Sequence, residues 1–219
     1  MGCDIHIHVE YKKDKFVGYD KAHEPKYEKR WMCGDYYKVN PYYDKNDKDE
    51  EEEPYDLVGF CDGRNYLRFA VLANVRNYDD IDYISEPRGI PEDVTEQVKA
   101  DCEAWGGDGH SHSYFTLREL IDYQNNIKPL KVRGMISPEA QKALDENGVL
   151  PDRYCQATNM SGWERREWTE ENTVLVPLIE ALKRRADELY VIYSWRWDES
   201  PYTAMEDAKN IRIVFWFDN

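Results

Sequence analysis

The sequence predicts an α+β fold, in which an antiparallel or mixed sheet formed by both chain ends carries helices from the middle of the chain. Residues 5–9 alternate apolar and polar side chains, as a half-buried strand does. Residues 211–217 are apolar almost throughout, which favours a strand inside the sheet, beside the opening strand. Residues 63–76 place apolar side chains around most of a helix circumference. We therefore expect a single α+β domain over residues 1–219.

Start and stop signals place the remaining elements. Ser/Thr capping residues followed by Glu, and Pro at a first helical position, mark helix starts, whereas Gly marks helix ends. The run 44–56 has almost no apolar residues and predicts a mobile acidic surface loop. The other expected elements are a turn and return strand at 11–19, an irregular stretch at 27–43, helices at 91–105, 116 onward, 137–148 and 169–189 (kinked or delayed by Pro177), and a strand at 190–197.

The charge of the chain limits its partners. The formal net charge is −15, whereas a protein that binds duplex nucleic acid needs a cationic footprint. We expect no duplex nucleic acid as partner, but a small anionic ligand held by a few arginines is compatible with this charge. The chain holds 17 Tyr and 7 Trp, which suit pocket walls and stacking surfaces as well as a core.

Cysteine use and hydropathy indicate a reducing cytoplasm. The five cysteines are scattered, without a C-x-x-C pair, and this spacing is typical of reduced thiols. No apolar segment resembles a secretory signal, and no run approaches the ~20 apolar residues of a membrane span. We therefore expect a cytoplasmic protein without a membrane partner.

Two His-x-His pairs give the strongest chemical signal. Imidazoles two residues apart on a strand share a face and can reach one cation. Zinc and similar first-row metals bind imidazole together with carboxylate. The alternative is a solvated polar face whose histidines form local hydrogen bonds. The candidate ligands of a divalent ion, zinc or manganese, are Asp4, His6, His8, His110 and His112.

Other polar residues suit supporting roles in such a site. Glu10 or Asp108 could act as the general base. Arg64 and Asn65 stand at a predicted helix start, where free backbone N–H groups and a guanidinium form an anion seat, and Arg88 is a second anion-binding candidate. Alternatively, Arg64 forms an ordinary ion pair beside a capped helix.

Three segments resemble a family of uncharacterised bacteriophage and prophage proteins that begin MGCDIH. The matching residues are Met1–His6, Gly63–Asn77, Gly109–Leu120 and Phe215–Asn219. The resemblance implies a phage gene product that acts in a bacterial host cytoplasm, and it carries no established reaction.

A local resemblance concerns metal-dependent hydrolases of the amidohydrolase and PHP phosphoesterase type, which open with D-x-H-x-H on a first strand. Asp4, His6 and His8 match that element. The chain lacks the β–α alternation of a barrel, so the resemblance implies shared local chemistry rather than a shared fold.

These observations leave two main functions open, beside a third interpretation as a structural or regulatory phage protein whose histidine face is incidental. The first is a phage-encoded metal-dependent hydrolase that cleaves a phosphoester of a nucleotide or similar small anion, with a metal-bound water as nucleophile. The second is a non-catalytic phage protein that binds a host protein or sequesters a nucleotide signal, with aromatic rings stacking the base and arginines holding phosphate.

Overall fold

The computed structural model describes residues 2–43, 54–58, 60, 64–78, 80–155, 160–193 and 207–218. Its strands are β1 (Ile5–Tyr19), β2 (Pro25–Cys33), β3 (Tyr36–Val39), β4 (Tyr55–Val58), β5 (His110–Thr116), β6 (Leu130–Ile136), β7 (Glu164–Glu170) and β8 (Ile211–Phe217). Its helices are α1 (Tyr66–Ala73), α2 (Glu96–Ala104), α3 (Leu117–Asn126), α4 (Pro138–Asn147) and α5 (Val176–Tyr193), with a 3₁₀ turn η1 (Asp207–Asn210) before β8.

A four-stranded antiparallel sheet in the order β2-β1-β8-β5 organises the molecule. β8 lies between β1 and β5, and all seven of its residues are buried. This arrangement confirms the predicted α+β fold, with strands from both chain ends side by side and helices from the middle of the chain.

One face of this sheet forms the main core. Ile7, Val9 and Tyr11 of β1 are buried there against α1, α3 and α5. In α1 six consecutive residues, Arg68–Ala73, are buried, which explains why this segment is apolar on most sides. Thr116 forms the predicted capping box with Glu119 at the start of α3, and Ser137 caps α4, which ends at Gly148 with φ 63°.

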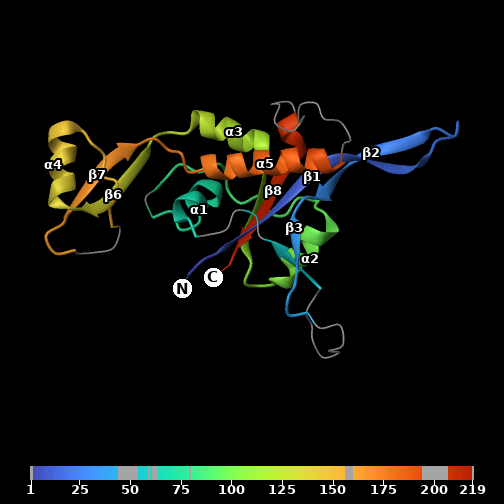
Figure 1. The fold of residues 1–219 in the computed structure, drawn as a ribbon, viewed down its shortest axis with the longest axis horizontal. Helices are drawn as coiled ribbons and strands as arrows, with labels where there is room; N and C mark the ends of the chain where they lie inside the picture. Colours follow the sequence, from blue (N-terminus) through green and yellow to red (C-terminus); the bar gives the residue numbers. More distant parts are fainter. Residues whose placement is uncertain are drawn as a thin grey trace.

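Two smaller units lie beside this sheet. β6 and β7 form an antiparallel pair that packs with α4 around Trp168 and Val132. Figure 1 shows this unit at the opposite end of the molecule from the β1–β2 hairpin, which projects away from the body. β3 and β4 form a second two-stranded sheet.

The predicted turn at 11–19 is wrong. β1 continues through these residues to Tyr19, and the turn falls at 20–24, where the Asp20 side chain accepts hydrogen bonds from the backbone N–H of Ala22 and Glu24. The charged residues that suggested a turn lie on an exposed two-stranded ribbon, where both faces meet water. The stretch 27–43, expected to be irregular, contains most of β2 and all of β3. Side chains on both faces of these strands are largely exposed, so the sequence shows no apolar period there.

Two further boundaries differ from the expectation. The helix expected from Pro91 begins only at Glu96, because buried Glu10 accepts the backbone N–H of Thr95 and fixes the helix start there. Residues 190–193 continue α5 rather than forming a strand, because α5 packs Leu182, Ala186 and Leu189 into the core and runs on from there. The rest of that expected strand, 194–197, lies outside the described residues.

The delayed helix start that Pro177 predicts is correct. α5 begins at Val176, directly before this proline, and Thr169 belongs to β7.

The acidic segment predicted at 44–56 falls largely outside the described residues, which resume at Pro54. Its last two residues, Tyr55 and Asp56, are paired with β3 in strand β4 and do not belong to a loop. Within the described part of the chain, no helix is long and apolar enough to cross a membrane.

Candidate functional site

The face of the sheet opposite the main core carries the histidines of β1. His6 and His8 share this face, as the alternation predicts, and both rings stack near Trp216 of β8, with centroid distances of 5.8 and 4.8 Å. α2 and the segment before it cover the middle of this face, where Val98, Val214 and Trp216 form a separate apolar cluster. The face is therefore interior at His8, which is 4% exposed, and partly open at His6, whose side chain is 24% exposed.

His8 lies between two carboxylates. Its Nδ1 lies 2.9 Å from Asp35 Oδ2, and its Nε2 lies 2.9 Å from Asp101 Oδ2 on α2. The side chains of His8 and Asp35 are 5% and 1% exposed, whereas that of Asp101 is 39% exposed. Burial lowers the pKa of His8, but the hydrogen bonds to Asp101 and Asp35 outweigh burial and raise it to about 9. At neutral pH His8 is an imidazolium with both nitrogens donating, which does not suit metal binding or general-base chemistry.

The turn between β2 and β3 holds Asp35 in place. Its other carboxylate oxygen accepts the backbone N–H of Val9 at 2.7 Å. Gly34 donates to Val9 O, and a Cβ at Gly34 would lie 2.9 Å from Leu189 Cδ1 and 3.3 Å from Val9 O, so a larger residue would require these neighbours to shift. Buried Arg185 of α5 donates from Nε to the carbonyl of Gly34. Contacts from β1 and α5 thus hold the turn that carries the carboxylate bound by His8.

We expect the stability of the protein to fall as pH rises from about 6.5 to about 9. The pKa of His8 is higher in the folded state than its ordinary 6.5, so its contribution is complete below pH 6.5 and is lost as pH rises through 9. The difference corresponds to about 3 kcal/mol of unfolding free energy. Urea unfolding at several pH values should show this loss in the wild type.

The His8→Gln variant is the control for that measurement, because it should show a much flatter profile over the same window. Burial raises the pKa of the Cys33 thiol to about 12, so this thiol begins to affect stability only above its ordinary value of 9. An equal pH dependence in the variant would show that His8 is not the responsible group.

The second histidine pair is divided by a bulge. His112 stacks on Trp216 with a centroid distance of 6.1 Å, whereas His110 lies against Phe217 at 6.0 Å. Trp216 and Phe217 are successive residues of β8, so their rings project from opposite faces. The pairing of β5 with β8 is irregular between His110 and Ser113, and Ser111 has φ 51°. Three histidines, His6, His8 and His112, therefore converge on the Trp216 ring, and His110 does not join them there.

The other predicted metal ligands and bases have partners within the chain. Arg64 Nε lies 2.6 Å from Asp4 Oδ1, and its Nη2 lies 2.7 Å from Oδ2, so the carboxylate is held in a two-bond pair. Glu10 is completely buried and binds Arg212 Nε at 2.7 Å. His6 Nε2 is 3.3 Å from Asp218. Each of these contacts gives the residue a structural role.

The remaining candidates lie apart from one another. Asp108 is exposed in the loop between α2 and β5. Arg88 pairs with Glu119 at 2.7 Å and lies over the Phe115 ring, on β5. Asn65 caps α1 by accepting the backbone N–H of Arg68. Arg64 and Asn65 line one cavity and Arg88 another, so the three do not form a single anion seat.

Metal coordination requires several ligands around one point. Among the described residues, no group of three or more His, Cys, Asp or Glu side chains is placed to hold a metal ion. Two buried ring nitrogens, Trp216 Nε1 and His110 Nε2, have no hydrogen-bond partner among the described residues.

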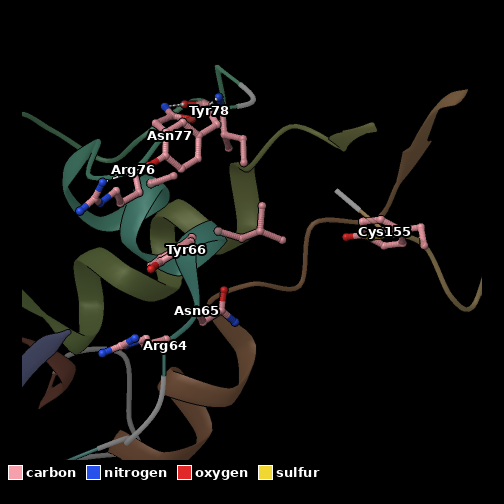
Figure 2. Close-up of a pocket in the computed structure, with 11 residues that line it drawn as sticks. Arg64, Asn65, Tyr66, Arg76, Asn77, Tyr78 and Cys155 are labelled. Carbon is pink, nitrogen blue, oxygen red and sulfur yellow. Dashed lines mark hydrogen bonds between the residues drawn. The ribbon is translucent and has the colours of Figure 1, made fainter. Parts of the chain in front are cut away.

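A cavity of about 430 Å³ opens between α1 and the chain near β6. We call it the α1 cavity. Three tyrosines, two arginines and two asparagines give it polar and aromatic walls. Figure 2 shows the guanidinium groups of Arg64 and Arg76 on the same side as the Tyr66 hydroxyl, and Cys155 across from them. Its lining residues are Arg64, Asn65, Tyr66, Leu67, Ala70, Arg76, Asn77, Tyr78, Ile81, Tyr154 and Cys155.

The loop after α1 forms one wall of this cavity and has unusual backbone angles. Asn74, Arg76 and Asp80 have φ values of 58°, 53° and 51°, although none is glycine. Asn77 holds the loop, because its side chain bonds both the N–H and the carbonyl of Ile81 at 2.8 Å. Backbone strain of this kind is concentrated at ligand-binding and catalytic sites, and the surrounding contacts must maintain it.

Sequence reasoning did not identify several residues of these sites. Asp35 and Asp101 are distant from His8 in the chain, and nothing in their local patterns links them to an imidazole. Tyr66 and Arg76 fall within the predicted apolar helix 63–76, and that pattern gives no sign that they line a cavity. The asparagines at 74 and 77 were an available signal, since Asn tolerates left-handed backbone and often marks a loop after a helix.

The chain was compared with protein-family models, curated proteins and solved structures, and none of the three comparisons finds a match.

Proposed function

We propose that the protein is a non-catalytic binding protein for a small aromatic anion, with a nucleotide as the expected ligand class, and that the α1 cavity is the binding site. The observation that carries this proposal is the cavity itself, in which arginine and tyrosine side chains surround an open volume of about 430 Å³. Concave sites of this size with a few placed polar groups are the usual form of a small-molecule site.

The arrangement suits the two parts of a nucleotide. The guanidinium groups of Arg64 and Arg76 point to one side of the cavity, where they can bind phosphate oxygens by charge-assisted hydrogen bonds. Arg64 is 55% exposed, so an anion can reach it while Asp4 still contacts it. The rings of Tyr66, Tyr78 and Tyr154 offer stacking surfaces for a base.

The predicted catalytic residues favour binding over turnover. His8 is protonated, Glu10 is buried against Arg212, and Asp4 is paired with Arg64. Each group would have to break a short contact before it could bind a metal or take a proton. A phage protein that sequesters a nucleotide in its bacterial host needs none of those steps.

The hydrolase is the second candidate, and one observation favours it. Three histidines, His6, His8 and His112, surround the Trp216 ring, whose buried Nε1 has no hydrogen-bond partner among the described residues. Rearrangement of Ser111 and its neighbours would be required before His6, His8 and His112 could share a zinc or manganese ion. The two functions make opposite predictions about metal content and about the state of the released ligand.

Incubation of the purified, untagged protein with a nucleotide panel separates these functions. We expect binding in calorimetry, and mass analysis of the released nucleotide should show it chemically intact. Arg76→Ala should weaken binding about tenfold or more, because it removes a charged contact to phosphate. Arg118→Ala, which removes an exposed arginine of α3, is the matched control and should bind normally.

Evidence of turnover and of a bound metal would contradict the binding proposal and support the hydrolase. It would consist of nucleotide returned in hydrolysed form, bound zinc or manganese in the purified protein, and loss of both in His6→Ala and His112→Ala. Absence of binding to every nucleotide, with the wild type folded, would contradict both functions.

A further inference from the structure

The β1–β2 hairpin extends well beyond the sheet. β8 pairs with β1 only from Ile5 to Tyr11, so the eight residues Lys12–Tyr19 project about 25 Å past it at a strand rise of ~3.3 Å per residue. We call residues 12–32 the arm. Figure 1 shows it leaving the body of the molecule on the side opposite α4.

The end of the arm carries an exposed aromatic cluster, the aromatic tip, formed by Phe16, Tyr19 and Tyr27. These side chains are 48%, 66% and 57% exposed. Their rings contact one another, with centroids of Phe16 and Tyr19 5.2 Å apart and of Phe16 and Tyr27 5.9 Å apart. A contiguous apolar group at the end of a projecting ribbon contributes nothing to the core, and such exposed groups mark interaction surfaces.

The charge of the arm is opposite to that of the body. The arm, residues 12–32, contains seven Lys or Arg and four Asp or Glu, which gives +3 and leaves −18 on the rest of the chain. The tip is more than two Debye lengths from the sheet at ~150 mM salt, so the charge of its own body is largely screened there. The arm is therefore suited to an acidic partner.

A complementary surface exists on the same chain. A recess of about 310 Å³ lies beside α2, and we call it the α2 recess. Apolar side chains form part of its lining, and three glutamates and one lysine supply its charge. Its lining residues are Ile90, Pro91, Glu92, Val94, Glu96, Lys99, Cys102 and Glu103.

We propose that the aromatic tip of one molecule docks in the α2 recess of a second copy of this chain. The apolar lining would receive the aromatic rings, and the glutamates would face the lysines of the arm. The arm is a paired ribbon with seven registered residue pairs that projects from the body, so it presents its tip to another molecule. A contact of this kind is small and electrostatically assisted, as in transient interfaces.

Sedimentation velocity on the purified protein tests this proposal. We expect reversible self-association that weakens as salt rises, because opposite charges meet at the contact. Phe16→Ser/Tyr27→Ser should weaken it about tenfold or more without lowering the thermal midpoint, since both rings are exposed. Tyr42→Ser, which removes another exposed ring (79%), is the matched control and should associate like the wild type.

The sharper experiment mixes two deficient variants. Glu92→Lys/Glu103→Lys should also abolish self-association, because it reverses charge at the recess, whereas Glu146→Lys/Glu171→Lys makes the same change elsewhere. Mixing the arm variant with the recess variant leaves one intact arm and one intact recess. A 1:1 complex should therefore form in the mixture although neither variant associates alone.

Several outcomes would overturn the proposal. One is a wild type that stays monomeric at every concentration and salt. A second is association that both double variants leave unchanged, and a third is a mixture that forms no complex. A single-stranded oligonucleotide, oligo(dT), is included as a probe. Binding to it that depends on the aromatic tip, without self-association, would assign the arm to nucleic acid instead.

Discussion

Asp35→Ala is expected to lower the free energy of unfolding by about 3–5 kcal/mol, because it leaves a buried charge without one of its partners. Asp35 is 1% exposed and binds both the His8 ring and the backbone N–H of Val9. Its loss leaves an imidazolium nitrogen and a backbone donor without partners in the interior. Single domains have only about 5–15 kcal/mol of stability, so this variant should be close to unfolding. Urea unfolding with an unchanged m-value is the measurement.

Asp101→Ala is the matched control for Asp35→Ala. Asp101 binds the other nitrogen of His8 at the same 2.9 Å, but its side chain is 39% exposed. Water can replace this carboxylate, so we expect a loss of about 1 kcal/mol or less. Equal losses for the two variants would show that burial does not determine the strength of these contacts.

Arg212→Met is expected to have a similarly large effect, about 3–5 kcal/mol, because it leaves Glu10 buried without a counterion. Arg212 is 3% exposed and binds Glu10 through both Nε and Nη2 at 2.7 Å. Its guanidinium also lies 3.9 Å from the centroid of the Trp31 ring. Thermal and urea unfolding of the single variant should both show the loss.

The double variant Glu10→Gln/Arg212→Met should recover more than half of that loss. The glutamine carbonyl can still accept the backbone N–H of Thr95, and no unpaired charge remains in the interior. If the double variant is as unstable as the sum of the two single variants, the pair stabilises the fold by itself, and desolvation is not the main cost.

The sequence predicted those parts of the fold that depend on local periodicity. The alternation in β1 and the apolar run in β8 indicated a sheet formed by both ends, and Thr116 and Ser137 marked helix starts correctly. The arm was misassigned, because charged residues in an exposed ribbon resemble a turn. Helix α2 starts later than Pro91 predicts, since its start is fixed by Glu10, a residue from another element.

The candidate sites were less predictable for a physical reason. The partners of His8 come from the β2–β3 turn and from α2, and hydrogen bonds between distant segments leave no periodic pattern in the chain. Arg64 was expected to bind a free anion, but Asp4 lies close enough in the fold to bind it. The bulge at Ser111, which separates His110 from His112, depends on backbone conformation that residue type does not reveal.

The position of β8 has a consequence for synthesis on the ribosome. β8 separates β1 from β5, and Ile5 pairs with Phe217, about 200 residues later. In a nascent chain whose β1, β2 and β5 have already left the ribosome, the β1–β2 hairpin therefore cannot be joined to β5 until β8 emerges from the exit tunnel. During that time the apolar edge of β1 is exposed, and early folding is limited to local units such as α3, α4 and the β1–β2 hairpin. We expect slow completion of folding and a need for chaperones at this stage.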